Sequence, residues 1–518
     1  MGNIAGKVML LSGFRRCFIA ILAGVIGSFS MPSSDLFLSS FVSFTLLIWL
    51  LDGISSNLGR MSAISRVGSS FFVGWLFGVG YFLAGLWWVR EGIVDQIGSR
   101  FPFWGVVLFF VMISFLLAIF YGVATSLASL LWSTGMGRIC VFACAVGFCE
   151  WLRSVLGIGT WNAIGYAAMP IPVMMQSVHW IGLFGMNALS VFCFASPALF
   201  GTRRDVNIGI ILSSTLLILH IAYGWWILTE DSKSSLKFEK ISPVIRIVQP
   251  GINPAIKEDR EKILERYLSL TALPVSAGEL EPVIIVWAYL PFPFSIVDQP
   301  SILKKIASVL KINQLLIVGS MRKELVDGRS HFYKSIYIIN SKGEILASSN
   351  ANHLVPFAEY LPYRNILKKL NLDFYMFPLD YSSSDISPLL GLSEKLRLYP
   401  LLFSDALFHQ DINNLENVSA ILNIIDDSGF MGSGTDHSFR YAQIQAVEIG
   451  LPLIRATNNG VSAFLDERGQ IISSVYADRG ASIDMHFQPK VRDSFRSSIQ
   501  MRVFWIIEFI LLILAVIV

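Results

Sequence analysis

Eight apolar segments of this sequence are long enough, or nearly long enough, to cross the hydrocarbon core of a membrane, which is about 30 Å thick. They lie at residues 17–31, 35–51, 68–89, 104–132, 139–152, 177–199, 207–228 and 503–518. The composition agrees, because 54% of the 518 residues are hydrophobic and only 15% are charged, whereas soluble proteins carry about 25% charged residues. The sequence therefore predicts a multi-pass α-helical membrane protein, with about seven N-terminal transmembrane helices and one at the C-terminus.

Two of these segments leave alternatives open. The segment at 139–152 is short, so it either extends into the following RSVLGIGTWN or is partly buried by neighbouring helices. The first segment follows Lys7, Arg15 and Arg16, as the apolar part of a cleaved signal peptide does. The many spans after it favour an uncleaved anchor.

The pattern changes between residues 229 and 502, where charged residues occur every few positions and short β-branched runs alternate with amphipathic stretches. This alternation is typical of a soluble α/β domain. The predicted strands lie at 244–250, 282–290, 315–320, 334–340, 399–405, 420–426 and 451–458, and the predicted helices at about 257–271, 300–312 and 436–450. The turns NSKGE and DERGQ each join two β-like runs and indicate hairpins. The chain thus divides into a membrane domain (1–228), a soluble domain (229–502) and a C-terminal transmembrane helix (503–518).

Charge and cysteine content exclude several classes of function. The net charge is only +3 and the basic residues are dispersed, so no nucleic-acid partner is expected. The soluble domain contains no cysteine, which excludes a disulfide framework there. No metal-ligand spacing links the cysteines, so neither a metal nor a cofactor is expected. All five lie in or beside the proposed spans: Cys17, Cys140, Cys144, Cys149 and Cys193.

Several motifs together resemble the apolipoprotein N-acyltransferase family, within the nitrilase or carbon-nitrogen hydrolase superfamily. They are GVGYFLAGLWWV, EWLRSVLGIGTWNAIGY, VQPGIN, NHLVPFAEYLP and AQIQAVEIGLPLIRATNNGVSAFLDERGQI, and the similarity runs over nearly the whole chain. The resemblance implies a nitrilase-like αββα sandwich beside the membrane helices. It also implies a reaction in which the sn-1 acyl chain of a phospholipid passes to the N-terminal diacylglyceryl-cysteine of an apolipoprotein. The implied partners are phospholipid, apolipoprotein and the membrane, and the implied state is a monomer.

The resemblance further implies a Glu, Lys and Cys site at strand ends, and this chain departs from it at each position. In the family, Cys forms a thioester with the acyl group, Glu is the general base, and Lys stabilises the oxyanion of the tetrahedral intermediate. The motif VWAYLPFPF places Tyr289 at the Glu position, and Ala351 stands at the Lys position ahead of NHLVPFAEYLP. The segment LFSD places Phe403 at the Cys position. No family catalytic residue is therefore expected to be intact.

The loss of the nucleophile does not depend on this alignment. Residues 194–518 contain no cysteine at all, so no thioester can form in the soluble domain. A further family motif appears as DDSGFMG, with Gly429 where the resemblance implies a substrate-lining Trp, and about two residues are missing before His437. The wall of the site is therefore expected to have changed as well.

Other motif residues are retained. His353 and Glu359 keep the loop motif, and Asp405 has a shorter carboxylate side chain than the family residue at its position. The predicted lining of the former substrate site consists of His353, Glu359, Asp405, Gly429 and His437. A structural role competes for each of them: Glu359 braces the loop, and His353 and His437 are packed side chains and not metal ligands.

Ser404 is the alternative nucleophile, with Asp405 beside it and His409 close in sequence. Adjacent strand residues point to opposite faces, however, so Ser404 would face away from the site unless a bulge reset the register. No serine mechanism is therefore favoured.

Two functions remain open at this stage. The first is the family's acyltransferase activity in lipoprotein maturation, in a degenerate and catalytically impaired form. The second is a non-catalytic membrane scaffold, or a pseudoenzyme that binds lipid or lipoprotein. Loss of both nucleophile and oxyanion donor favours the fold without the reaction.

The basic residues predict the orientation of the chain in a bacterial inner membrane. If the N-terminus is cytoplasmic, eight Lys and Arg residues lie in inner segments and three in outer loops, which is the asymmetry that the positive-inside rule requires. The soluble domain is then periplasmic. The inner residues are Lys7, Arg15, Arg16, Arg60, Arg66, Arg138, Arg203 and Arg204, and the outer ones are Arg90, Arg100 and Arg153.

A reporter enzyme that is active only outside the cytoplasm tests this orientation. Fused after Lys233, at the start of the soluble domain, it should be active, because seven spans precede that position. The same reporter fused after Arg204, a predicted inner position, should be inactive. Cytoplasmic behaviour of the Lys233 fusion would overturn the periplasmic assignment.

Overall fold

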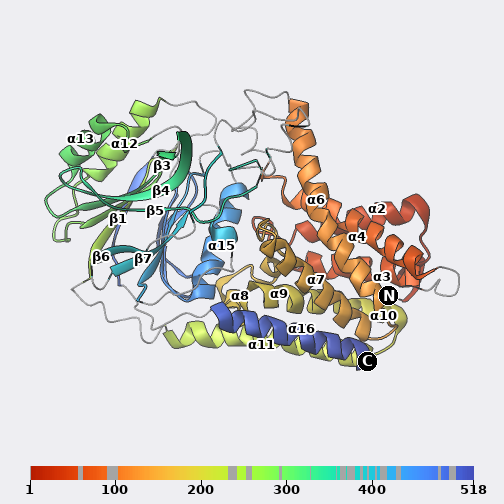
Figure 1. Cartoon of the computed structure of the whole chain (residues 1–518). Helices are drawn as coiled ribbons and strands as arrows, with labels where there is room; N and C mark the ends of the chain where they lie inside the picture. Colours follow the sequence, from red (N-terminus) through yellow and green to blue (C-terminus); the bar gives the residue numbers. More distant parts are fainter. Residues whose placement is uncertain are drawn as a thin grey trace. The chain divides into compact units, whose positions relative to one another are not determined.

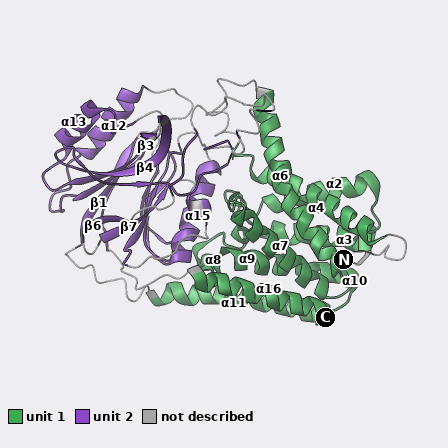
Figure 2. Ribbon diagram, viewed as in Figure 1, with its two compact units in different colours: residues 1–90, 101–233, 497–518 green, residues 91–100, 234–496 purple. Residues whose placement is uncertain are grey.

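The computed structural model describes most of the chain. The described residues are 2–55, 62–89, 103–231, 242–252, 259–290, 295–326, 328–356, 359–361, 364, 369, 380–384, 389–393, 396–402, 405–408, 417–427, 433–476, 480–488 and 497–517. They form two compact units, which Figure 2 distinguishes by colour: a helical unit of residues 1–90, 101–233 and 497–518, and an α/β unit of residues 91–100 and 234–496.

The helical unit contains a described helix at each of the eight apolar segments. Within it the C-terminal helix packs against α7 and α9, although more than 300 residues separate them in sequence (Figure 1). The longer helices are α1 (Gly2–Met9), α2 (Gly13–Ser28), α3 (Leu38–Ser55), α4 (Ala63–Gly85), α6 (Phe103–Leu130), α7 (Gly137–Val155), α9 (Val178–Ala195), α11 (Val206–Asp231) and α16 (Ser497–Ile517).

Six of the described helices are long and apolar enough to cross a membrane, which confirms the predicted helical membrane region. These six lie within α3, α4, α6, α9 to α10 (Leu199–Thr202), α11 and α16. Helix α2 has only 16 residues, and α7 carries Arg138, Glu150 and Arg153 within 19 residues. Helix α2 is thus too short, and α7 too highly charged, to be counted with the six. The count of seven N-terminal spans stays a prediction.

Glycines allow α2 and α4 to pack closely. A side chain at Gly24 would collide with the backbone of α4 at Phe77, and one at Gly80 would collide with the backbone of α2 at Ile21. Helices in a membrane associate through such close packing, because lipid tails supply no hydrophobic driving force between them.

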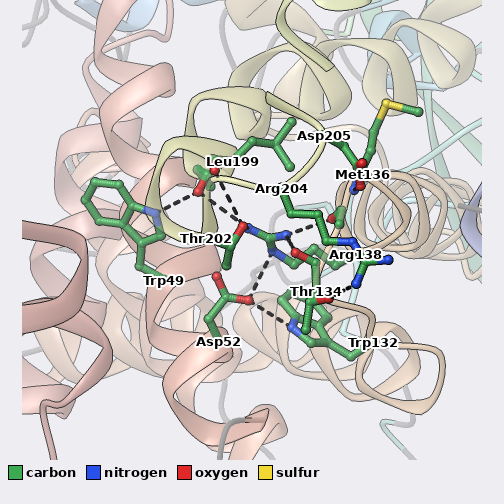
Figure 3. Close-up of polar contacts among 12 residues, drawn as sticks. Trp49, Asp52, Trp132, Thr134, Met136, Arg138, Leu199, Thr202, Arg204 and Asp205 are labelled. Atoms are coloured by element: carbon green, nitrogen blue, oxygen red, sulfur yellow. Dashed lines mark hydrogen bonds and ion pairs between the residues drawn. The ribbon is translucent and has the colours of Figure 1, made fainter. Parts of the chain in front are cut away.

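A buried arginine ties several helices of this unit together (Figure 3). Arg138 is fully buried in the first turn of α7, where the helix dipole disfavours a cation. Its Nε lies 3.1 Å from the Asp52 carboxylate of α3, and its other nitrogens donate to the Thr134 carbonyl at 2.6 Å and the Thr202 hydroxyl at 3.0 Å. The Trp132 indole also donates to Asp52, at 3.0 Å. The charge of Arg138 is therefore paired with a carboxylate away from water.

Replacement of Arg138 by Met should destabilise the helical unit. Asp52 would lose its ion-pair partner, which costs about 3–5 kcal/mol for a buried pair. Thermal unfolding of the detergent-solubilised protein measures the change, with the exposed Arg203→Gln as the matched control. Equal unfolding midpoints for the two variants would contradict a structural role for this pair.

The α/β unit contains two six-stranded sheets. Their strand orders are β12-β1-β2-β3-β4-β5 and β11-β10-β9-β8-β7-β6, with parallel pairing from β1 to β3 and from β7 to β9. The first sheet consists of β1 (Val244–Gln249), β2 (Ile284–Tyr289), β3 (Leu315–Val326), β4 (Arg329–Asn340), β5 (Ile345–Asn350) and β12 (Ala481–His486). The second consists of β6 (Leu390–Ser393), β7 (Leu396–Leu402), β8 (Ala420–Ile424), β9 (Leu453–Ala456), β10 (Ser462–Leu465) and β11 (Ile471–Val475).

The two sheets lie face to face with helices on their outer faces (Figure 1). Helices α12 (Arg260–Thr271) and α13 (Pro300–Val309) cover the first sheet, and α15 (Ser433–Ile449) covers the second. Side-chain alternation along β8 shows the arrangement: Leu422 and Ile424 join the core with the first sheet, whereas Ile421 joins the core under α15. The predicted αββα sandwich is therefore confirmed.

Each predicted strand and helix overlaps a described one, but β3 and β4 are both longer than predicted, and β6 and β12 were not predicted. Strand β4 begins at Arg329, before the predicted start at residue 334. The hairpins at NSKGE and DERGQ are present as β4–β5 and β10–β11. Strand β3 runs to Val326, beyond the predicted end at residue 320, and pairs with β4 along twelve residues. The extension carries charged residues such as Arg322, Lys323 and Glu324, so its apolar pattern is too weak to indicate a strand.

Candidate functional site

The carboxyl ends of parallel strands from both sheets meet at one place in the α/β unit. The backbone N–H of Tyr289, at the end of β2, donates to the carbonyl of Ile425, just after β8, at 3.3 Å. The Asn458 amide, just after β9, donates to the Tyr289 carbonyl at 2.7 Å and to the Asp426 carboxylate at 2.8 Å. Ligands of α/β proteins bind at such strand ends, and this is where the candidate site lies.

Tyr289 occupies this place with its side chain buried. A Cβ at Gly319 of β3 would come within 2.5 Å of Tyr289 Cδ2 and 3.0 Å of Ile424 Cγ2, so the missing side chain of Gly319 makes room for the ring. The Tyr289 hydroxyl is buried and has no hydrogen-bond partner among the described residues. Buried polar groups are rarely left unpaired, so this hydroxyl calls for an explanation.

Lys334 of β4 brings a positive charge to the same cluster. Its ammonium forms an ion pair with Glu359 of the loop that follows β5 and lies 5.3 Å from the ring centroid of Tyr381. The Lys334 side chain is 20% exposed, whereas that of Glu359 is 5% exposed, so the cluster remains open to solvent on the lysine side.

The sequence reasoning above missed Lys334, although a signal was present. In the strand KSIYIIN, alternation places Lys334 on the same face as Ile336 and Ile338, which are core residues. A lysine at an inward position of a core strand is unusual, because ammonium groups are almost never buried without a partner. The partner, Glu359, is distant in sequence, so the pairing could not be read from the strand itself.

The electrostatics of the cluster follow from burial and from this pairing. Burial disfavours the charged form of Lys334, but Glu359 and Tyr381 outweigh it and raise its pKa, so the amine is protonated. Burial raises the pKa of the Tyr289 phenol well above its ordinary value, and the neighbouring Tyr381, Asp426 and Glu359 raise it further. The Tyr289 hydroxyl therefore keeps its proton and can act only as a neutral donor or acceptor.

The retained loop residues have structural contacts. Glu359 accepts a hydrogen bond from the Val355 N–H at 2.8 Å, in addition to its pairing with Lys334. Asp405 accepts from the backbone N–H of His353 at 2.9 Å and of Leu402 at 3.1 Å. These carboxylates thus accept hydrogen bonds from the backbone of this loop and of the end of β7.

The other predicted residues are placed as follows. Ala351 is buried beside Lys334, and its N–H donates to the Lys334 carbonyl at 2.8 Å. His353 stacks on Phe408 with 4.7 Å between ring centroids. His437 is buried in α15, and burial, with a smaller effect of Arg440, lowers its pKa to about 3, so it is neutral. Four further positions lie outside the described residues: Phe403, Ser404, His409 and Gly429.

A second polar network supports the strand ends and was also not predicted. Asp427 accepts from the N–H groups of Asn459 at 2.8 Å and Gly460 at 3.0 Å. The Tyr267 hydroxyl of α12 donates to the Asn458 side chain at 2.6 Å. Because Asn458 also contacts Tyr289 and Asp426, this network fixes the end of β2 against the second sheet.

The helical unit and the sandwich define a class of protein: a membrane-embedded chain that carries a carbon-nitrogen-hydrolase-type domain. Two family models match it. The model of the apolipoprotein N-acyltransferase N-terminal domain matches residues 23–196, and the carbon-nitrogen hydrolase model matches residues 246–483.

Whole-chain relatives identify the family within this class. An apolipoprotein N-acyltransferase of Allorhizobium ampelinum is 42% identical over 484 residues, which cover 92% of this chain and 90% of that protein. Those of Rhizobium rhizogenes and Agrobacterium fabrum are 41% and 39% identical, with 100% of this chain and 98% of each relative covered. The chain belongs to the apolipoprotein N-acyltransferase family, as its motifs indicated.

A solved structure is similar to about half of this chain. An amidase from Nesterenkonia sp. has 15% sequence identity and a TM-score of 0.36, with 49% of this chain and 94% of that chain covered. At this level of similarity the comparison adds nothing to the family assignment.

Replacement of Gly319 by Ala should disturb the candidate site directly. The added Cβ would overlap the Tyr289 ring and press on Ile424, and such overpacking costs about 1–3 kcal/mol. The unfolding midpoint of the purified protein measures the change. Gly391→Ala is the matched control, because a Cβ at this strand glycine would meet nothing within 4 Å. Equal stability of the two variants would show that the Tyr289 ring does not lie over Gly319.

Proposed function

We propose that this chain is a catalytically impaired apolipoprotein N-acyltransferase, which keeps the family's fold and does not complete its reaction. One observation carries the proposal: residues 194–518 contain no cysteine. In the family reaction a thiolate attacks the sn-1 ester carbonyl of a phospholipid, and the glycerol oxygen leaves as the thioester forms. Without a thiol in the α/β unit that first step has no nucleophile.

The contacts of Tyr289 and Ala351 support the same conclusion. The phenol of Tyr289 stays protonated at neutral pH because its pKa is raised well above the ordinary value, so it is unsuited to the role of general base. Ala351 has no charged group. By resemblance these two positions and Phe403 correspond to the family's base, oxyanion donor and nucleophile.

The second candidate is a non-catalytic membrane protein that binds lipid or lipoprotein. The buried cluster of Lys334, Glu359 and Tyr289 favours it, because a polar cluster without catalytic use is costly to keep in a protein core. For both candidates we propose phospholipid and apolipoprotein as partners, a monomeric state, and an inner-membrane location with the α/β unit in the periplasm. The orientation rests on the distribution of basic residues.

An acyl-transfer assay tests the proposal. The purified full chain, incubated with a phospholipid labelled in its sn-1 acyl chain and a diacylglyceryl peptide, should form neither a labelled acyl-enzyme nor a triacylated peptide. The Agrobacterium fabrum relative, assayed in parallel, is the positive control. Robust transfer by the wild-type chain would refute the proposal, and Ser404→Ala would then show whether that serine is the nucleophile.

A repaired variant sharpens the same test. Tyr289→Glu, Ala351→Lys and Phe403→Cys together restore the three groups that the family reaction requires, and the labelled thioester should become detectable. The rate should stay low, since a misplacement of about 1 Å costs about a hundredfold and the loop around Gly429 also departs from the family pattern. The matched control carries the first two replacements only, so its α/β unit has no thiol.

A further inference from the structure

A cavity of about 280 Å³ lies between α9 and α11 of the helical unit. Packed protein interiors leave few voids larger than one water molecule, so a space of this size is more than a packing defect. All of its described lining residues belong to the helical unit. Most of them are apolar, such as Ile181, Met186, Leu189, Phe194 and Leu216.

Hydrogen bonds join the two helices at both ends of the cavity. At one end the Trp180 indole donates to the Tyr223 hydroxyl at 2.8 Å. At the other end the Cys193 thiol donates to the Ser213 carbonyl at 3.7 Å. Ser213 and Tyr223 are ten residues apart in α11, which corresponds to about 15 Å along the helix axis. The cavity is therefore elongated and runs along the two helices.

A break in α9 lies beside the cavity. Gly182 has φ 70° and ψ 164°, and α9 is kinked there, because this backbone conformation is open almost only to glycine. Ile181 and Met186, on either side of the kink, both line the cavity. Broken helices are tolerated within membranes where their backbone is buried in protein or lines a cavity.

The cavity opens on the outer surface of the helical unit. Trp180 and Leu219 line it and are 55% and 59% exposed, whereas Ser190 on its inner wall is 4% exposed. Helix α11 is the least buried of the six candidate spans and lies along the edge of the unit in Figure 1. A membrane span that is exposed in this way faces lipid tails, so the cavity opens towards lipid.

Size and charge indicate what the cavity can hold. Its volume lies just below the range of about 300–1,000 Å³ for pockets that hold drug-sized ligands, and a second protein's helix, about 10–12 Å in diameter, is too thick to enter. None of its described lining residues is Lys, Arg, Asp or Glu. Both ring nitrogens of His220 are engaged, by the Ser177 hydroxyl at 2.6 Å and the Ala168 carbonyl at 3.1 Å. A free fatty acid would thus find no cation for its carboxylate, whereas an uncharged hydrocarbon chain fits.

We propose that this cavity binds one acyl chain of a membrane phospholipid as a resident ligand, which the protein does not consume. The ester end of the chain lies at Trp180 and Tyr223, because such amphipathic aromatic side chains belong at the membrane–water interface. The exposed Trp225 and Trp226 belong to the same end of α11. The methyl end lies towards Cys193. The inference does not rest on the proposed function, since it needs no reaction and involves only the helical unit.

A photo-crosslinking phospholipid tests this site. The purified full chain is reconstituted into vesicles of phosphatidylethanolamine and phosphatidylcholine that contain a small fraction of phosphatidylethanolamine with a diazirine near the methyl end of one acyl chain. After irradiation, digestion and mass spectrometry locate the label. Ser190 and Cys193 are buried lining residues and should be labelled, because a lipid chain reaches them through the cavity. Label at Ile218, which is 64% exposed, reports the surrounding lipid.

Two tryptophan substitutions at adjacent positions of α11 assign the label to the cavity. Leu217 lines the cavity, whereas Ile218 is not among its lining residues. Leu217→Trp should fill the space and reduce labelling of Ser190 and Cys193 severalfold, and Ile218→Trp should leave it unchanged. Leu217→Phe adds less volume and should reduce the labelling less, so the test still holds if the tryptophan variant does not fold.

The outcomes are decisive for the cavity alone. Equal labelling of Ser190 and Cys193 in the Leu217 and Ile218 variants, or label confined to exposed positions such as Ile218, would overturn the lipid site. Either result would leave the proposed function untouched. Acyl transfer by the wild-type chain would overturn the proposed function, whereas loss of the buried label in Leu217→Trp would still support the lipid site.

Discussion

A charge that leaves water needs an opposite charge or several hydrogen bonds, and this requirement shapes both units of the protein. In the helical unit, Arg138 is held by Asp52, by the Thr134 carbonyl and by the Thr202 hydroxyl. In the α/β unit, Lys334 is held by Glu359. Each pair joins residues of two different segments of its unit.

In the α/β unit, the apolar cores tolerate substitutions better than the site that they position. Many apolar residues on two sheets and three helices form its cores, and such cores tolerate substitutions that keep volume and pattern. The site depends on a few positions: the missing side chain of Gly319, the contacts of Asn458 and the charge of Lys334. A chain can therefore stay about 40% identical to family members and still differ at its site, as we propose for this one.

The proposed impairment follows from the groups that this site contains. Acyl transfer needs a nucleophile, a base and an oxyanion donor together. Tyr289 offers a neutral hydroxyl and Lys334 a protonated amine, and in these states neither is a nucleophile or a base.

The sequence alone determined the apolar helices, the αββα sandwich, its hairpins, the family, and the absence of cysteine from the α/β unit. These features follow from local periodicity, from motifs and from composition, all of which lie within short stretches of chain. Only the tertiary structure revealed the Lys334–Glu359 pair, the place of the Tyr289 ring over Gly319 and the role of Asn458. These contacts join residues that are 25 to 169 positions apart. Such residues become neighbours only when the strand order and the register of the sheets bring them together. A one-residue change of register would turn each side chain to the opposite face of the sheet.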